Sequence, residues 1–355
     1  MPVASGRRAD INLDEETLAH VGNLQETLRR ASLHRLKSLT EKELEIFCVN
    51  ECSSHAFGVQ SLTGLPGQRR AQYGLLPENV WVSCVKGCKG ANDSSANQDN
   101  YSFCQYGEFE LYCLQDGHGS GGHFVSYRGV RSLPYLVTQS VHFPLSVECA
   151  ILEGYRLCHD DLVRHSLEQG YDIQISGAAC VLVIRKKDKV WISHTGDSRV
   201  ILGDVASPTP LFETVDHKPV IPAERLRLEA SGSEIQTFTF DEGKIEIARV
   251  FVKGTDYPGL CMSRSIGDQS VKDHGVIPLP DIHSHHVHAG LYILLATDGI
   301  WEFIPSKLIT ASVAKKLALE GTEKCLNRIV TEAKKRWRTN EGNYCDDITA
   351  MMIRI

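Results

Sequence analysis

Aspartates recur in this sequence beside segments that have the apolar or alternating pattern of β-strands. Such segments include NYSFCQY, FELYCLQ, LYILLA and ITAMMIRI, and an aspartate stands within two residues of one end of each. The aspartates concerned are Asp99, Asp116, Asp298, Asp346 and Asp347, and Asp197 lies between two further segments of this kind. If these strand ends meet at one rim of the fold, the carboxylates form a cluster.

A cluster of carboxylates requires cations. Two unit charges about 5 Å apart repel by roughly 3 kcal/mol at an effective dielectric constant of about 20. Oxygen ligands without His or Cys select hard ions, so the pattern predicts Mg²⁺ or Mn²⁺. A single Asp-Gly pair, such as Asp116-Gly117, is by itself typical of a turn. It is the joint placement of the aspartates at strand ends that favours a metal site.

The glycines after Asp116 offer a different interpretation. Gly117, Gly119 and Gly122 form G-x-G-x-x-G after a strand-like segment, which is the pattern of a dinucleotide-binding turn. Such a fold places an acidic residue about 20 positions further on, to hold the ribose. The segment 123–147 contains neither Asp nor Glu, so the sequence argues against a dinucleotide site.

Composition restricts the class of protein. The chain has 355 residues, 42% hydrophobic content and a net charge of −6, which argues against a nucleic-acid or anionic-membrane partner. No apolar run approaches the ~18 residues of a membrane span, and the first residues are too charged for a signal peptide. Twelve cysteines without a secretion signal indicate free thiols in a reducing compartment. We therefore expect a cytoplasmic protein, with the nucleus as the alternative.

The order of predicted elements indicates the fold class. From about residue 80, hairpin-like strand pairs alternate in blocks with helical segments such as SVECAILEGYRLCHDDLVRH, SKLITASVAKKLALEG and KCLNRIVTEAKKRW. Such blocks predict packed antiparallel sheets covered by helices rather than a βαβ winding. Before residue 80, apolar residues at helical spacing and a capping-box pattern at Thr40 to Glu43 predict helices. We therefore divide the chain into a helical extension, 1–78, and a second domain, 79–355.

A series of motifs resembles a known family. NQDNYSF, LQDGHG, SGAACVLVI, HTGDSRVIL, DHKP, MSRSIGD, ATDGIWEF and CDDITAMMI occur in this order. In this the sequence resembles the metal-dependent (type 2C) serine/threonine protein phosphatases. The resemblance implies an α+β fold, a four-layer αββα sandwich of two antiparallel sheets flanked by helices, as the catalytic domain. It also implies phosphoprotein substrates, a monomer, and a variable flap within 205–260.

The resemblance also implies roles for individual residues. Two Mg²⁺ or Mn²⁺ ions would be held by Asp99, Asp116, the carbonyl of Gly117, Asp298 and Asp346, and a weaker third ion by Asp197 and Glu302. Asp116 would bridge the two ions. Water shared by the ions would attack phosphorus directly and in line, without a phosphoenzyme. His118 would protonate the departing serine or threonine oxygen.

The sequence departs from the family pattern at several positions. Gln98 stands where glutamate is common, Glu302 where aspartate is commoner, and Asp347 where asparagine is. The arginine that clamps phosphate in many members is absent from 90–96, and Lys89 is the nearest cation before that segment. We expect Lys89 to contact the substrate phosphate, as a point charge rather than a bidentate fork. None of these changes removes a predicted core ligand.

Alternatives remain at this stage. A pseudophosphatase that only binds phosphoproteins, or a two-metal hydrolase of small phosphoesters, would share the fold. Four histidines, His283, His285, His286 and His288, resemble a metal cluster but favour a solvated edge strand. DHKP favours a structural turn before the helix AERLRLEA, and Arg264 has either a structural role or a carboxylate partner near the site. The motif RRAS fits a basophilic kinase site at Ser32. The sequence does not indicate the substrate protein or the role of the extension.

Overall fold

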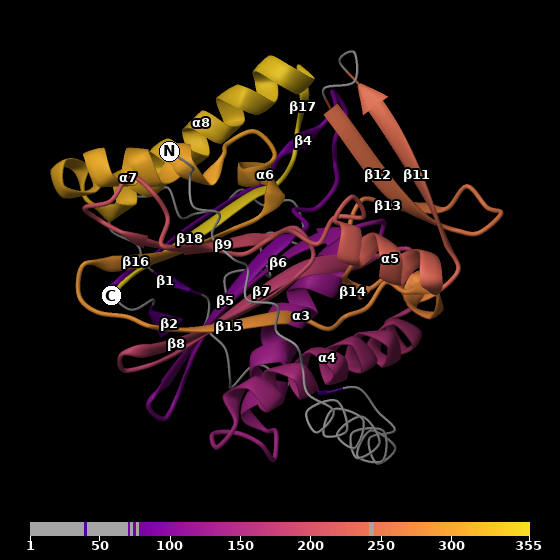
Figure 1. Ribbon diagram of the computed structural model, residues 1–355, viewed down its shortest axis with the longest axis horizontal. Helices are drawn as coiled ribbons and strands as arrows, with labels where there is room; N and C mark the ends of the chain where they lie inside the picture. Colours follow the sequence, from indigo (N-terminus) through magenta and orange to yellow (C-terminus); the bar gives the residue numbers. More distant parts are fainter. Residues whose placement is uncertain (1–38, 41–69, 72–73, 76–77, 241–244) are drawn as a thin grey trace, which may run out of the picture. The chain divides into compact units, whose positions relative to one another are not determined.

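The computed structural model describes residues 39–40, 70–71, 74–75, 78–240 and 245–355 (Figure 1). Contacts divide the chain into residues 1–38 and a compact unit, Leu39–Ile355. Most of the segment before residue 80 in which helices are predicted, including Glu43 of the capping-box pattern, lies outside the described residues, and so does Ser32. The boundary at 78/79 therefore stays a prediction.

Two antiparallel sheets form the centre of the compact unit. The first has the order β15-β8-β7-β6-β5, with β14 paired to β7, and the second has the order β10-β9-β16-β18-β3. The strands of the first sheet are β5 (Asp99–Tyr106), β6 (Phe109–His118), β7 (Gly177–Lys186), β8 (Lys189–Thr195), β14 (Ile266–Gly267) and β15 (Asp281–His286). Those of the second are β3 (Val80–Val85), β9 (Arg199–Asp204), β10 (Phe212–Glu213), β16 (Leu291–Ala296) and β18 (Ile348–Arg354). The predicted antiparallel sheets are confirmed.

Helices cover the outer face of each sheet (Figure 1). Helices α3 (Gly122–Thr138) and α4 (Val147–Gln169) pack on the first sheet. Helices α6 (Asp298–Trp301), α7 (Ser306–Glu320) and α8 (Thr322–Glu341) pack on the second. The result is the predicted αββα order of layers. In the described part of the chain, no helix has both the length and the apolar character needed to cross a membrane.

Strand β16 shows why an unbroken apolar segment was required. All of its residues are buried. Ile293 and Leu295 belong to the core between the two sheets, whereas Leu294 and Ala296 belong to the core beneath α6, α7 and α8. Successive side chains point to opposite faces of a strand. A strand with a sheet on one face and helices on the other must therefore be apolar at every position.

Smaller elements extend this frame. A third sheet has the order β11-β12-β13, and β4 pairs with β17 in a two-stranded ribbon. The strands concerned are β4 (Cys88–Lys89), β11 (Ser233–Phe240), β12 (Ile245–Val252), β13 (Pro258–Leu260) and β17 (Tyr344–Cys345), with β1 (Arg70–Ala71) pairing with β2 (Gly74–Leu75). Helix α5 (Pro222–Ala230) and the 3₁₀ helix η4 (Gln269–His274) lie near the third sheet. The predicted helix after DHKP and the edge position of the histidine-rich strand are both confirmed.

Helix α3 was not predicted from the sequence. Gly129 and Pro134 within it lower intrinsic helix propensity. The structure explains the glycine, since a Cβ at position 129 would lie 2.1 Å from the Gln115 Oε1 of β6. The glycine that weakens the local helical signal is therefore the residue that lets α3 pack closely on the Gln115 side chain.

Candidate active site

Asp99 and Asp116 face each other across neighbouring strands. They are directly paired positions of β5 and β6. The sequence suggested positions just outside the strands, but both residues lie within them. Asp99 accepts a hydrogen bond from the Thr297 hydroxyl at 2.9 Å, and Asp116 Oδ2 lies 3.4 Å from the backbone N–H of Asp298. The start of α6 therefore meets the paired strand ends.

The remaining predicted carboxylates join the same group. Asp298 begins α6, Asp346 lies between β17 and β18, and Asp197 lies between β8 and β9. Burial, the largest cause, raises the pKa of Asp116, and the nearby charges of Asp298, Asp99, Asp346 and Asp197 raise it further. Segments far apart in the sequence thus bring their carboxylates together.

The donor set fits hard divalent cations. Burial raises the pKa values of both Asp99 and Asp298, and neighbouring carboxylates, including Asp346, add to the effect. One carboxylate oxygen of Asp99 and one of Asp197 are buried without a hydrogen-bond partner in the described structure. Buried carboxylates normally have hydrogen-bond partners, ion pairs or metals. A cation among them would satisfy these oxygens and offset the repulsion.

Glu302 follows α6 and lies near this group. Its backbone N–H donates to the Asp298 carbonyl at 2.8 Å, and its charge contributes to the raised pKa of Asp298. Glu302 is exposed, so it stands at the solvent side of the cluster.

Gly117 allows the chain to turn tightly beside the carboxylates. A Cβ at this position would lie 2.3 Å from the Gly122 carbonyl oxygen and 2.7 Å from the Gln98 carbonyl oxygen. The Gly117 N–H also donates to the Gln98 carbonyl at 3.0 Å. Both close neighbours are backbone atoms, which cannot move aside as a flexible side chain could. Glycine is therefore required here by close packing and not by a nucleotide.

His118 has a carboxylate partner that the sequence did not reveal. Its Nε2 lies 2.9 Å and 2.8 Å from the two carboxylate oxygens of Asp268. Burial lowers the pKa of His118, but the Asp268 charge outweighs this effect, so the net pKa is raised. Asp268 also accepts from the Ser265 hydroxyl at 2.5 Å. The motif MSRSIGD contains Asp268, but nothing in its spacing indicates that a histidine 150 residues away is its partner.

Lys218 is a second contact missed from the sequence. Its ammonium lies 2.5 Å from Asp197 Oδ2, so the lysine of DHKP reaches the carboxylate group. The histidine of the same motif, His217, is buried within the fold, as expected for a structural turn. One motif therefore supplies both a structural residue and a contact to the site.

Lys89 and Asp347 occupy the side of the cluster near β4. Lys89 Nζ lies 3.1 Å from Asp346 Oδ1 and 3.3 Å from the Gln98 side-chain oxygen. The Asp347 carboxylate accepts from the backbone N–H groups of Gly87 at 2.7 Å and Gln98 at 2.8 Å. Asp347 thus joins three chain segments, and Lys89 is a cation placed beside the predicted ligands.

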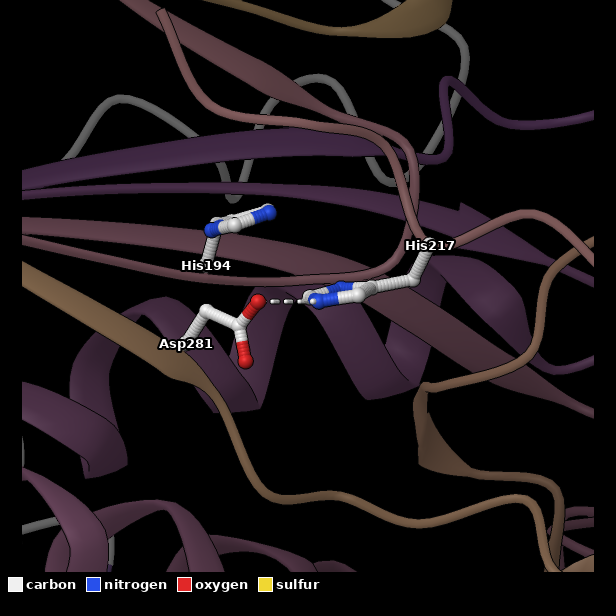
Figure 2. A group of neighbouring side chains, drawn as sticks. All are labelled: His194, His217 and Asp281. Atoms are coloured by element: carbon white, nitrogen blue, oxygen red, sulfur yellow. Dashed lines mark ion pairs between the residues drawn. The ribbon is translucent and has the colours of Figure 1, made fainter. Parts of the chain in front are cut away.

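A second group of ligand-type side chains differs from this cluster because it contains histidines. His194, His217 and Asp281 have ligand atoms within 4.8 Å of one another (Figure 2). The two imidazole rings are stacked, with centroids 4.4 Å apart and planes inclined by 9°. Metal ions bind near the plane of an imidazole, so stacked rings cannot both direct a lone pair at one ion.

The hydrogen bonds of the two histidines support a structural role. His194 Nε2 lies 2.8 Å from the Val215 carbonyl, and His217 Nδ1 accepts from the Gly196 N–H at 3.2 Å. His217 Nε2 lies 3.2 Å from Asp281 Oδ2 (Figure 2). Burial lowers the pKa of His194 to about 3. These residues form a stacked pair rather than a chelating set.

Arg264 belongs to this structural network. It contacts Glu224 at 2.7 Å and Asp281 at 2.7 Å. Of its two expected roles, these contacts support the structural one.

Comparisons with known proteins identify the class. The family model of protein phosphatase 2C matches residues 84–342. The chain therefore belongs to the type 2C protein phosphatases, and it is a metal-dependent protein serine/threonine phosphatase acting on phosphoproteins.

Curated relatives and solved structures agree with this assignment. Probable protein phosphatase 2C 12 of Oryza sativa subsp. japonica is 33% identical over 306 residues, covering 72% of this chain and 77% of its own. Probable protein phosphatase 2C 34 of Arabidopsis thaliana is 29% identical over 290 residues, covering 76% and 78%. The serine-threonine phosphatase 2C of Toxoplasma gondii has a TM-score of 0.64 at 20% identity, covering 78% of this chain and 94% of its own. At that identity the structural likeness concerns the fold.

Proposed function

We propose that this phosphatase hydrolyses phosphoserine and phosphothreonine by direct, in-line attack of water on phosphorus, without a phosphoenzyme. The observation that carries the proposal is the carboxylate cluster with the His118–Asp268 pair at its edge. The residues proposed to hold two Mg²⁺ or Mn²⁺ ions are Asp99, Asp116, the Gly117 carbonyl, Asp298 and Asp346, with Asp197 and Glu302 at a weaker third position. When bound, such ions lower the pKa of water and neutralise charge on the phosphoryl group.

His118 is proposed as the general acid. Asp268 engages Nε2 through both of its oxygens, whereas Nδ1 is buried without a hydrogen-bond partner in the described structure. We propose that a protonated His118 keeps its Nε2–H on Asp268 and transfers the proton on Nδ1 to the departing serine or threonine oxygen. Asp268 would position the ring and stabilise its charged form.

Lys89 is proposed to contact the substrate phosphate. Its ammonium already lies beside Asp346 and Gln98, and a phosphate entering the cluster would offer it further oxygens. We also propose that residues 79–355 carry the catalytic activity and that the protein acts as a monomer.

Phosphate release from a phosphothreonine peptide tests the reaction. Turnover is expected with Mn²⁺ and should stop after exhaustive chelation, because oxygen-only sites hold these ions loosely. Full activity after chelation would contradict the assignment of the ligands. Metal binding without any turnover would favour a pseudophosphatase, and hydrolysis of small phosphoesters alone would favour a metabolite hydrolase.

The leaving group tests the role of His118. A serine alkoxide requires a proton in the transition state, whereas a nitrophenolate does not. General acid catalysis contributes ~10²–10⁴ in rate, so His118→Ala should slow phosphoserine hydrolysis by about that factor and p-nitrophenyl phosphate hydrolysis far less. If chemistry limits the rate and both substrates lose equally, His118 supports the geometry of the site instead.

A further inference from the structure

The β4–β17 ribbon has two different faces. Cys88 lies directly opposite Cys345, and Lys89 directly opposite Tyr344. Side chains alternate between the faces of a strand pair, so Lys89 and Tyr344 share one face and the cysteines share the other. The first face meets the carboxylate cluster, since Lys89 Nζ lies 3.1 Å and the Tyr344 hydroxyl 3.4 Å from the Asp346 carboxylate. The cysteine face lines a pocket.

This pocket has a volume of about 770 Å³ and lies between the ribbon and the C-terminal part of α8. Its basic side chains are those of Lys86, Lys334 and Arg338. Lys86 is paired with Asp93 at 2.5 Å. Lys334 and Arg338 lie one helical turn apart, and among the residues that the structure describes neither has an acidic partner.

The two unpaired cations interact unfavourably with each other. Burial, the largest cause, lowers the pKa of Lys334, and the neighbouring Arg338 lowers it further. Like charges at i and i+4 of a helix destabilise it. Elsewhere on the same helix the pattern differs, because Arg328 is paired with Glu320 at 2.7 Å and Arg336 with Glu332 at 2.9 Å. An anion in the pocket would relieve a repulsion that this part of the helix otherwise retains.

We propose that the pocket binds acidic residues of the phosphoprotein substrate, close in sequence to the phosphorylated residue. The inference rests on the proposed function. The pocket lies next to the cluster in the chain, since Asp346 follows Cys345 of the pocket and Lys89 follows Cys88 of the pocket. The ribbon stands between the cluster and the pocket, and an extended residue spans about 3.3 Å. The acidic residue recognised is therefore within a few positions of the phosphorylated one, and about three positions is the spacing to test first.

Three phosphoserine peptides test this proposal with the full chain. One carries glutamates centred three positions before the phosphoserine, one carries them three positions after it, and one has glutamines at both places. Phosphate release gives kcat/KM, and fluorescence anisotropy of the same peptides with a non-hydrolysable phosphonate gives affinity. One glutamate peptide should be preferred, and the preference should shrink at high salt because exposed charges are screened.

The variant K334Q/R338Q should remove this preference. Two exposed ion pairs correspond to a loss of about twofold to thirtyfold in kcat/KM and in affinity for the acidic peptide. The glutamine peptide and p-nitrophenyl phosphate should be unaffected. The control is Lys335→Gln, which removes one charge from an exposed residue of α8 that does not line the pocket.

Two results would overturn the proposal. The first is equal binding and turnover of glutamate and glutamine peptides by the unaltered chain. The second is the same loss in Lys335→Gln as in K334Q/R338Q, which would assign the effect to general charge. Tighter binding of a glutamate phosphonate peptide without hydrolysis of any phosphopeptide would support the pocket while contradicting the proposed phosphatase reaction.

Discussion

Arg128 and Asp161 form a buried ion pair that also holds the main chain of a residue far upstream. Arg128 Nε and Nη2 lie 2.7 Å and 3.1 Å from the two oxygens of Asp161. Arg128 Nη2 also donates to the Leu39 carbonyl at 2.7 Å, and the Leu39 N–H donates to Asp161 at 2.6 Å. Leu39 is 2% exposed and belongs to the main core. We expect the removal of either member of the pair alone to destabilise the protein strongly.

Arg128→Met should destabilise the protein severely. The variant leaves the Asp161 carboxylate buried with the Leu39 N–H as its described partner. Breaking a buried ion pair by removing one member costs about 3–5 kcal/mol. In a domain of this size 1 kcal/mol corresponds to roughly 1.5–2 °C in Tm, so the expected fall is about 5–10 °C. The double variant R128M/D161L replaces the pair with apolar groups and should recover much of the loss.

Urea denaturation followed by tryptophan fluorescence, in the presence of chelator, measures these differences. The control is Arg225→Met, because Arg225 pairs with Glu229 on α5 while both are well exposed, and loss of such a pair costs about 0.2–1 kcal/mol. The reasoning fails if R128M is no less stable than R225M, or if the loss of stability in R128M/D161L equals the sum of the losses in the two single variants.

A chain that begins near residue 75 lacks Leu39 and should be less stable while retaining hydrolysis of a small phosphoester.

Three further outcomes are expected. Asp116→Asn should abolish turnover. Without metal, the variant should melt no lower than the unaltered protein, because it relieves repulsion within the cluster. A Tm several degrees lower for the variant, measured by calorimetry with chelator, would contradict this expectation. Glu224→Gln should lower stability at neutral pH by on the order of 3 kcal/mol, because contacts led by Arg264 lower the pKa of Glu224 from 4.5 to about 2 despite its burial. A carboxyl group whose pKa is lowered by folding stabilises the folded state at pH values above its pKa in the unfolded chain, and this stabilisation is lost as pH falls from about 4.5 towards 2. The free energies of unfolding of the two proteins, measured with urea, should therefore converge in that pH range. A difference that stays constant with pH would exclude this linkage. Gly117→Ala should cost at least about 1–3 kcal/mol, because its Cβ would meet the Gly122 carbonyl oxygen; unchanged urea denaturation would show that the backbone can shift.

The sequence alone determined the class of fold, the family and the positions of the candidate ligands. Periodicity is a local property, so the apolar run of β16 and the helical spacing of α4, α7 and α8 could be recognised directly. The aspartates could be placed at strand ends for the same reason. Where local signals conflicted with packing, as in α3 with Gly129 against Gln115, prediction failed because the reason for the glycine lies on another element.

Only the tertiary structure decided the partners of these residues. His118 with Asp268, Lys218 with Asp197, and Leu39 with the Arg128–Asp161 pair all join distant segments. Such pairs leave no spacing signal, because the intervening chain length does not fix where two segments meet. The same holds for the stacked rings of His194 and His217. Their ligand-type side chains can be recognised in the sequence, but only their orientation in space separates a packed pair from a metal site.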